Sequence, residues 1–160
     1  MLIVDLERVQ LITIFVQWIR PVVESGQVNP AVKYCQEIFP VLSGLAQKFV
    51  AFAPMLERVC RCWRYMVFSY RTTVTPLLPD LANKLVAGFA TSRQGCFLWA
   101  TAAVIREFGM AGENVDEATL NAVFQFYEQQ ATTFLRALND FIPEELPDGK
   151  MMFAVGVQTG

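Results

Sequence analysis

Residues 54–71, with the sequence PMLERVCRCWRYMVFSYR, decide the fold. At about 100° per residue, the apolar side chains of this stretch fall on one side of a helix and its basic side chains on the other. The apolar side is formed by Val59, Cys62, Trp63, Met66, Val67 and Tyr70. Four arginines share an arc of roughly 140° on the opposite side, and they are Arg58, Arg61, Arg64 and Arg71. We therefore expect an amphipathic helix with one face in a core and the other face cationic.

Proline and glycine divide the rest of the chain into segments of similar length. Asn29 and Pro30, for example, are typical of a helix start, and Gly109 is typical of a helix end. The segments predict helices over approximately 4–19, 30–49, 54–71, 76–90, 96–108 and 116–141.

The helix starts recur about every 20 to 24 residues, so pairs recur about every 40 to 46, the period of HEAT and armadillo arrays. No stretch has the alternating pattern of a half-buried strand. We expect an all-α fold, a HEAT-repeat α-solenoid of about six antiparallel helices (roughly three repeats) that forms a single segment over residues 1–160. A compact six-helix bundle is the alternative that periodicity leaves open.

The composition restricts the class of protein. Hydrophobic residues make up 54% of the 160 residues and charged residues 18%, which favours a packed core over disorder. The net charge of -2 gives no overall attraction to nucleic acid or to an anionic membrane. The absence of histidine excludes a histidine base, a Ser-His triad and a histidine zinc site. With no glycine-rich phosphate loop and no metal-ligand spacing, we expect no enzyme, no cofactor and no metal.

The cysteines and the N-terminus favour an intracellular protein. Cys60 and Cys62 form a C-x-C pattern instead of the C-x-x-C of redox and zinc motifs, so reduced, buried thiols are expected. Asp5 and Glu7 interrupt the start of the chain, which lacks the basic start of a signal peptide. No apolar run approaches the roughly 18 residues that span a bilayer, and we expect no membrane partner.

The cationic face of the 54–71 helix permits two interpretations. A row of arginines can hold a repeated phosphate array, as in a multiply phosphorylated peptide, because each guanidinium presents a planar fork of donors. Alternatively, the face is solvated, with Glu57 supporting Arg61 one turn later. Phe68 falls between Arg61 and Arg64, where it is a stacking partner for guanidinium groups, an apolar contact for a ligand, or covered by a neighbouring repeat.

Several short stretches carry a resemblance to a known family. They are 22–27 (VVESGQ), 36–42 (QEIFPVL), 57–64 (ERVCRCWR), 95–98 (GCFL) and 107–109 (EFG). In this order and spacing, they resemble the karyopherin-β nuclear import receptors, and among these the transportin-SR type. The resemblance covers residues 5–148 and stops before the apolar end of the chain.

The resemblance implies a segment of a longer receptor, in which the arginine-bearing helix lies on the concave side of the solenoid. There it would bind cargo, namely phosphorylated Arg/Ser-rich or related RNA-binding proteins. The motif match implies this cargo-binding role for Arg58, Arg61 and Arg64, and Arg71 would extend the same row. Phe68 occupies a position where the family tends to have a further arginine.

The same resemblance implies further partners and a location. The partners would be Ran GTPase, in the full-length receptor, and nucleoporins, with no direct contact to nucleic acid. The receptor would shuttle between cytoplasm and nucleus. The alternative function is a purely structural helical-repeat scaffold that makes no direct contact with cargo.

Overall fold

The computed structural model describes residues 2–18 and 30–109, together with positions that stand singly or in pairs between Glu117 and Asn139. These residues are helical apart from short turns, and none of them lies in a strand. Two compact units are present, Met1–Leu77 and Leu78–Gly160, and each is described by itself. None of the helices in the described ranges is long and apolar enough to cross a membrane.

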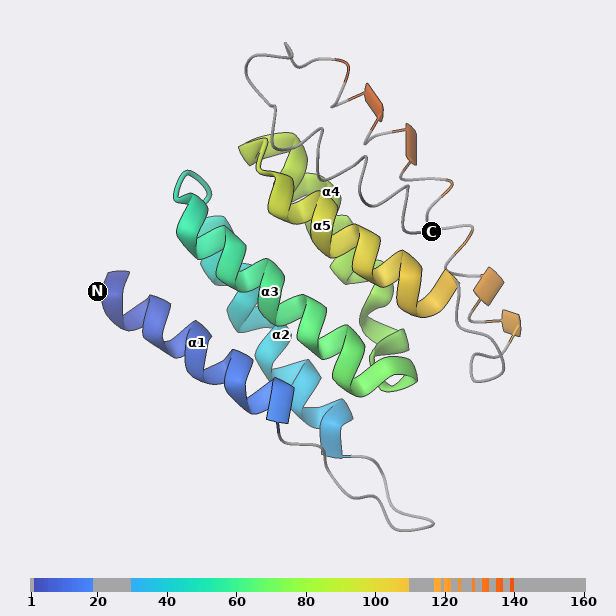
Figure 1. The fold of residues 1–160 in the computed structure, drawn as a ribbon, viewed down its shortest axis with the longest axis horizontal. Coiled ribbons are helices and arrows are strands. Elements are labelled where there is room, and N and C mark those ends of the chain that lie inside the picture. The colour runs from blue at the N-terminus through green and yellow to red at the C-terminus, as the bar shows by residue number, and fades with distance from the viewer. Residues whose placement is uncertain are drawn as a thin grey trace. The chain divides into compact units, whose positions relative to one another are not determined.

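The first unit is built around its third helix. It contains α1 (Leu2–Trp18), α2 (Pro30–Lys48), α3 (Ala53–Tyr70) and the 3₁₀ segment η1 (Arg71–Leu77). Both α1 and α2 pack against α3, as the ribbon shows (Figure 1). The helix that carries the arginines is therefore the central element of this unit.

Local sequence explains where α3 begins and which face it buries. Pro54 lies in the first turn, where a missing N–H leaves no hydrogen bond unmade, and Phe52 precedes the helix in an extended conformation. All six residues predicted for the core face are buried, with Val59, Cys62 and Val67 fully inaccessible to solvent. The prediction of the buried face of α3 is thus confirmed.

The ends of α3 and α4 depart from the predicted bounds. A helix over 54–71 would include Arg71, but this residue adopts φ 41° and ψ -122°, which ends α3 at Tyr70. The next helix was expected from residue 76, whereas the 3₁₀ segment η1 includes Pro76 and the α-helix begins at Leu78. The 3₁₀ segment η1 packs against α2 and α3, so the residues before Leu78 make contacts with the first unit instead of extending α4.

The second unit pairs two helices. In it, α4 (Leu78–Ser92) packs against α5 (Gly95–Val104), and the π-helical turn η2 (Ile105–Gly109) follows α5. The predicted 96–108 helix is thus an α-helix whose last turn widens. Most of the helix predicted over 116–141 lies outside the described residues, and the positions described between Glu117 and Asn139 are helical.

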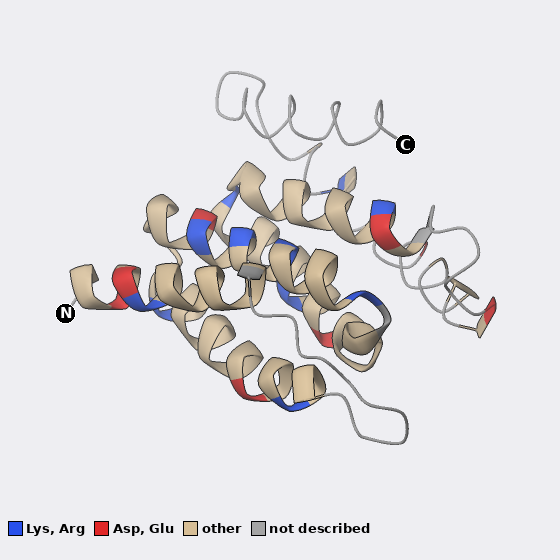
Figure 2. Ribbon diagram, turned by 60° about the horizontal axis from the view of Figure 1, so that its bottom comes forward, with Lys and Arg blue, Asp and Glu red and all other residues tan. Residues whose placement is uncertain are grey.

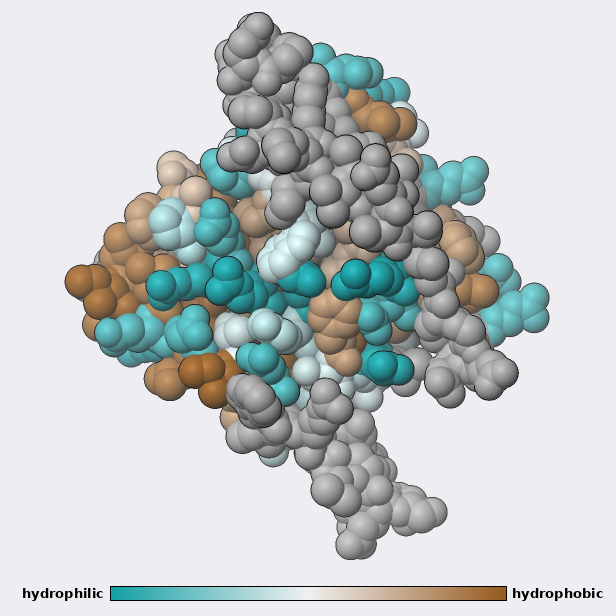
Figure 3. All heavy atoms as spheres, viewed as in Figure 1, coloured by the Kyte–Doolittle hydropathy of each residue, from teal (hydrophilic) through white to brown (hydrophobic). Residues whose placement is uncertain are grey.

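The outward side of α1 is apolar. Ile3, Val4, Leu11 and Ile14 are exposed, while Val9 and Val16 on the inward side are fully buried. Hydrophobic residues gather accordingly near the N-terminal end of α1 in the space-filling view (Figure 3). Binding experiments on this chain therefore need a check for self-association through apolar surface.

Candidate functional site

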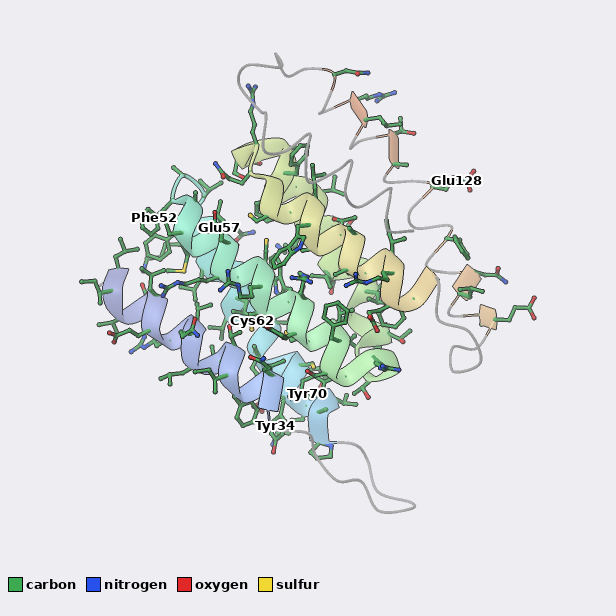
Figure 4. The ribbon with its side chains drawn as sticks, in the orientation of Figure 1. Tyr34, Phe52, Glu57, Cys62, Tyr70 and Glu128 are labelled. Carbon is green, nitrogen blue, oxygen red and sulfur yellow. The ribbon has the colours of Figure 1, made fainter. Side chains whose placement is uncertain are left out.

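The five residues predicted to bind cargo all lie on α3 or at its C-terminal end. Arg61 and Arg71 are exposed, and the other three, Arg58, Arg64 and Phe68, are half-buried. Most of the ribbon is formed by residues other than lysine, arginine, aspartate and glutamate, so charged positions are few (Figure 2). Glu57 is the one acidic residue in the α3 sequence, and it lies near the beginning of the helix (Figure 4).

Arg58 joins α3 to α1. Its Nη1 atom donates a hydrogen bond of 3.2 Å to the backbone carbonyl oxygen of Leu6. The donor and acceptor are 52 residues apart in the sequence. Arg58 therefore has a structural role in the first unit, in addition to any role on the cationic face.

Arg64 and Phe68 form a stacked pair one turn apart. The guanidinium carbon of Arg64 lies over the Phe68 ring, 5.4 Å from its centroid. This geometry is a cation–π interaction, which is worth about 0.5–1 kcal/mol at an exposed site. Among the roles left open for Phe68 by the sequence, the structure shows stacking on a guanidinium.

Arg61 is the exposed cation near the middle of α3. Its side chain makes no hydrogen bond or ion pair with any residue that the structure describes. The pair between Glu57 and Arg61, expected if the face is simply solvated, is not formed. Ion pairs that do form within the described ranges include those of Asp5 with Arg8 and Lys48, and that of Lys33 with Glu37.

Arg71 projects from the end of α3. Its backbone N–H donates to the carbonyl oxygen of Val67, which closes the last turn. Its side chain is exposed and, like that of Arg61, has no ion-pair partner within the described part of the chain. The face thus offers two exposed guanidinium groups with a stacked Arg64–Phe68 pair between them in sequence, an arrangement suited to phosphate or carboxylate ligands.

The four cysteines belong to α2, α3 and α5, and their thiols are buried. Cys35, Cys60, Cys62 and Cys96 form no disulfide and are buried, as predicted. Burial raises the pKa of Cys35 to about 12, with a further contribution from Cys62 nearby. Burial also raises the pKa of Cys62 to about 11, although a hydrogen bond with Thr13 opposes the shift. At neutral pH the thiols of Cys35 and Cys62 are protonated and weakly nucleophilic. Cys62 points into the first unit (Figure 4).

These shifts predict a loss of stability at alkaline pH. Well below pH 9 the thiols of Cys35 and Cys62 are protonated in both the folded and the unfolded chain, so their full contribution to stability is present. As the pH rises above 9, the unfolded thiols ionise first and the free energy of unfolding falls by about 1.4 kcal/mol per pH unit for each thiol. The fall ends as the pH passes about 11 for Cys62 and about 12 for Cys35.

Urea unfolding at pH 8 and pH 10.5 measures this loss of stability. A Cys62→Ala chain should show a shallower slope, and an unchanged slope would contradict this origin.

No metal site is present in the part of the chain that the structure describes. There, no three or more histidine, cysteine, aspartate or glutamate side chains lie close enough to hold an ion. The arginine face is consequently the feature of the described residues with the clearest binding chemistry.

Comparison with known proteins identifies the family of this chain. The family described as the Transportin-3/Importin-13 fourth TPR domain matches residues 29–136. An uncharacterised protein of Schizosaccharomyces pombe is 30% identical over 142 residues, which are 89% of this chain and 15% of that protein. The mRNA transport regulator MTR10 of Saccharomyces cerevisiae is 28% identical over 95 residues, which are 59% of this chain and 10% of that protein. The chain spans less than a fifth of the length of these relatives.

The family match includes the whole of α3 and its arginines, whereas α1 lies before it. It confirms the predicted fold class, an all-α helical-repeat solenoid, although the family description names TPR repeats where we predicted HEAT repeats. Both repeat types stack helix pairs, so each repeat packs against its neighbours. The resemblance to nuclear import receptors is confirmed as well. This chain belongs to the Transportin-3/Importin-13 family of karyopherin-β proteins and corresponds to a segment of their helical-repeat array.

Proposed function

We propose that this chain is a cargo-binding segment of a nuclear import receptor. In this proposal, α3 binds phosphorylated Arg/Ser-rich or related RNA-binding proteins. Arg61 and Arg71 make the direct contacts, the stacked Arg64 and Phe68 border them, and Arg58 holds the helix against α1. Membership of a transportin family supports a role in transport, as does the description of the budding-yeast relative as an mRNA transport regulator.

The observation that carries the proposal is the exposure of Arg61 and Arg71. Both guanidinium groups are exposed and neither has an ion-pair partner among the described residues. The chain as a whole has a net charge of -2, so overall charge does not account for unpaired cations on one helix. A phosphate group accepts two parallel hydrogen bonds from a guanidinium, and such charge-assisted bonds are about twice as strong as neutral ones.

The wider assignments follow from the proposed receptor role. A receptor of this kind carries cargo and catalyses no reaction, so the segment needs no cofactor. In the full-length receptor, Ran GTPase and nucleoporins would be further partners, and the receptor would shuttle between cytoplasm and nucleus. Contact with RNA would be made by the cargo and not by this segment.

A second candidate function is a structural scaffold without direct cargo contact. The hydrogen bond from Arg58 to Leu6 favours it, because it shows that one arginine of the face serves packing. The scaffold predicts that charge reversal at Arg61 and Arg71 leaves cargo import unchanged. The cargo-binding proposal predicts that the same change abolishes import of phosphorylated cargo.

A peptide titration tests the proposal directly. A fluorescent Arg-Ser repeat peptide should bind the chain at least about tenfold more tightly when its serines are phosphorylated, a difference of about 1.4 kcal/mol. Replacement of Arg61 by alanine should weaken this binding about tenfold, because hydrogen bonds between charged groups contribute about 1.5–3 kcal/mol. Fluorescence anisotropy at 50 and 300 mM salt measures both effects, and affinity should fall with salt because exposed charges are screened.

Two variants serve as controls. Lys33→Ala removes an exposed cation from α2 and should leave the affinity unchanged. Glu57→Gln removes the acidic residue of α3 and should strengthen binding, since the carboxylate repels phosphate. Equal affinities for the phosphorylated and unphosphorylated peptides would rule the proposal out.

A further inference from the structure

Arg71 occupies a backbone conformation that favours glycine. Its φ of 41° and ψ of -122° lie in a region that residues with a side chain rarely adopt. Strained conformations of this kind persist where the surrounding structure holds them, and they concentrate at binding sites. Here the hydrogen bond from the Arg71 N–H to the Val67 carbonyl and the start of η1 hold the residue in place.

Glycine at position 71 would relieve this strain, so arginine at this position lowers stability relative to glycine. A cation at a helix C-terminus interacts favourably with the helix dipole, but that interaction is weaker than the strain of the conformation. The exposed side chain makes no ion pair with the described residues that would offset the strain. Because such strain concentrates at ligand-binding positions, we take Arg71 as a candidate contact for the ligand.

The distance from Arg61 to Arg71 then sets a spacing for the ligand. Ten residues of helix span about 15 Å. An extended peptide advances about 3.3–3.6 Å per residue, so four residues cover about 13–14 Å. Because side chains alternate between the two sides of an extended peptide, an even separation places both groups on the side that faces α3.

We propose that α3 binds two phosphate groups that are four residues apart in an extended peptide, one at Arg61 and the other at Arg71. This inference rests on the proposed function and specifies its ligand. The hydrogen bond from the Arg71 N–H to the Val67 carbonyl holds the backbone of the second anchor at the end of α3, and the stacked Arg64–Phe68 pair lies between the two anchors along the helix. Arg58 donates to Leu6 and is not one of the two anchors.

Synthetic peptides of one composition test the spacing. Three peptides contain two phosphoserines, at positions i and i+2, i and i+4, or i and i+8, in an otherwise neutral, flexible sequence. A fourth peptide contains one phosphoserine. Anisotropy titrations on the whole chain should give the tightest binding for the four-residue spacing. We expect the affinity of this peptide to be at least fivefold higher than that of the peptide with eight-residue spacing and that of the peptide with a single phosphate.

The Arg71→Gly chain provides the second readout. It should have a higher melting temperature than the natural chain, so a loss of binding cannot be attributed to unfolding. It should bind all the doubly phosphorylated peptides about as weakly as the single phosphate, whereas Lys33→Ala keeps the natural preference. Phosphate-dependent binding without a preference for spacing, or a preference that survives in Arg71→Gly, would overturn this inference alone. Binding that ignores phosphate altogether would overturn the proposed function as well.

Discussion

Replacement of Gly88 by alanine is expected to destabilise the α4–α5 pair by about 3 kcal/mol, the upper part of the usual range for overpacking. A Cβ atom at this position would lie 2.5 Å from Cζ and 2.8 Å from Cδ1 of Phe97, and closer still to Cε1. Such separations are far below van der Waals contact. Phe97 is only 2% exposed, so any movement of its ring takes place inside the protein and displaces buried neighbours. One helix would have to move away from the other.

Gly44 provides a matched control for Gly88. It also lies inside a helix, but a Cβ atom there would meet nothing within 4 Å. Gly44→Ala should therefore stabilise the chain by up to about 1 kcal/mol through helix propensity alone. Urea unfolding of the two variants measures the contrast, and Gly88→Ala combined with Phe97→Leu should recover part of the loss. Equal stabilities for the two alanine variants would show that α4 and α5 are not closely packed at Gly88.

The interior of α3 is readily predicted from sequence because its signals are local. Side chains three and four residues apart share one side of a helix, so the spacing of Val59, Cys62, Trp63 and Met66 specifies the buried face. The end of the helix is different. The positive φ of Arg71 gives no signal in the sequence, since arginine is not a residue type that favours it.

The candidate site likewise contains one contact between residues close in the sequence and one between residues far apart in it. The stacking of Arg64 on Phe68 joins neighbours one turn apart, and helical angles place them together. Arg58 donates a hydrogen bond to the backbone carbonyl of Leu6. Because every residue has a backbone carbonyl, the sequence does not identify this acceptor. Sequence patterns therefore identify the cationic face but do not show which arginine is used within the fold and which two are exposed.

Replacement of Trp63 by alanine is expected to have the largest effect on the first unit, a loss of about 3–5 kcal/mol. The indole is 1% exposed and packs against Phe39 of α2, with the ring centroids 6.0 Å apart. Its removal would leave a cavity at the helix on which both α1 and α2 pack. Urea unfolding monitored by circular dichroism measures the loss.

Trp63→Phe separates the packing contribution of the side chain from its polar atom. The indole Nε1 of Trp63 is buried and has no hydrogen-bond partner among the described residues. An unsatisfied buried donor costs about 1–3 kcal/mol, so its removal with the smaller ring should offset part of the lost packing. We expect Trp63→Phe to lose less than about half as much stability as Trp63→Ala and to retain phosphopeptide binding. Similar losses for the two variants would contradict this account. Trp63 directly precedes Arg64 in α3, so measuring phosphopeptide binding by Trp63→Phe tests whether the cationic face depends on the packing of the apolar face.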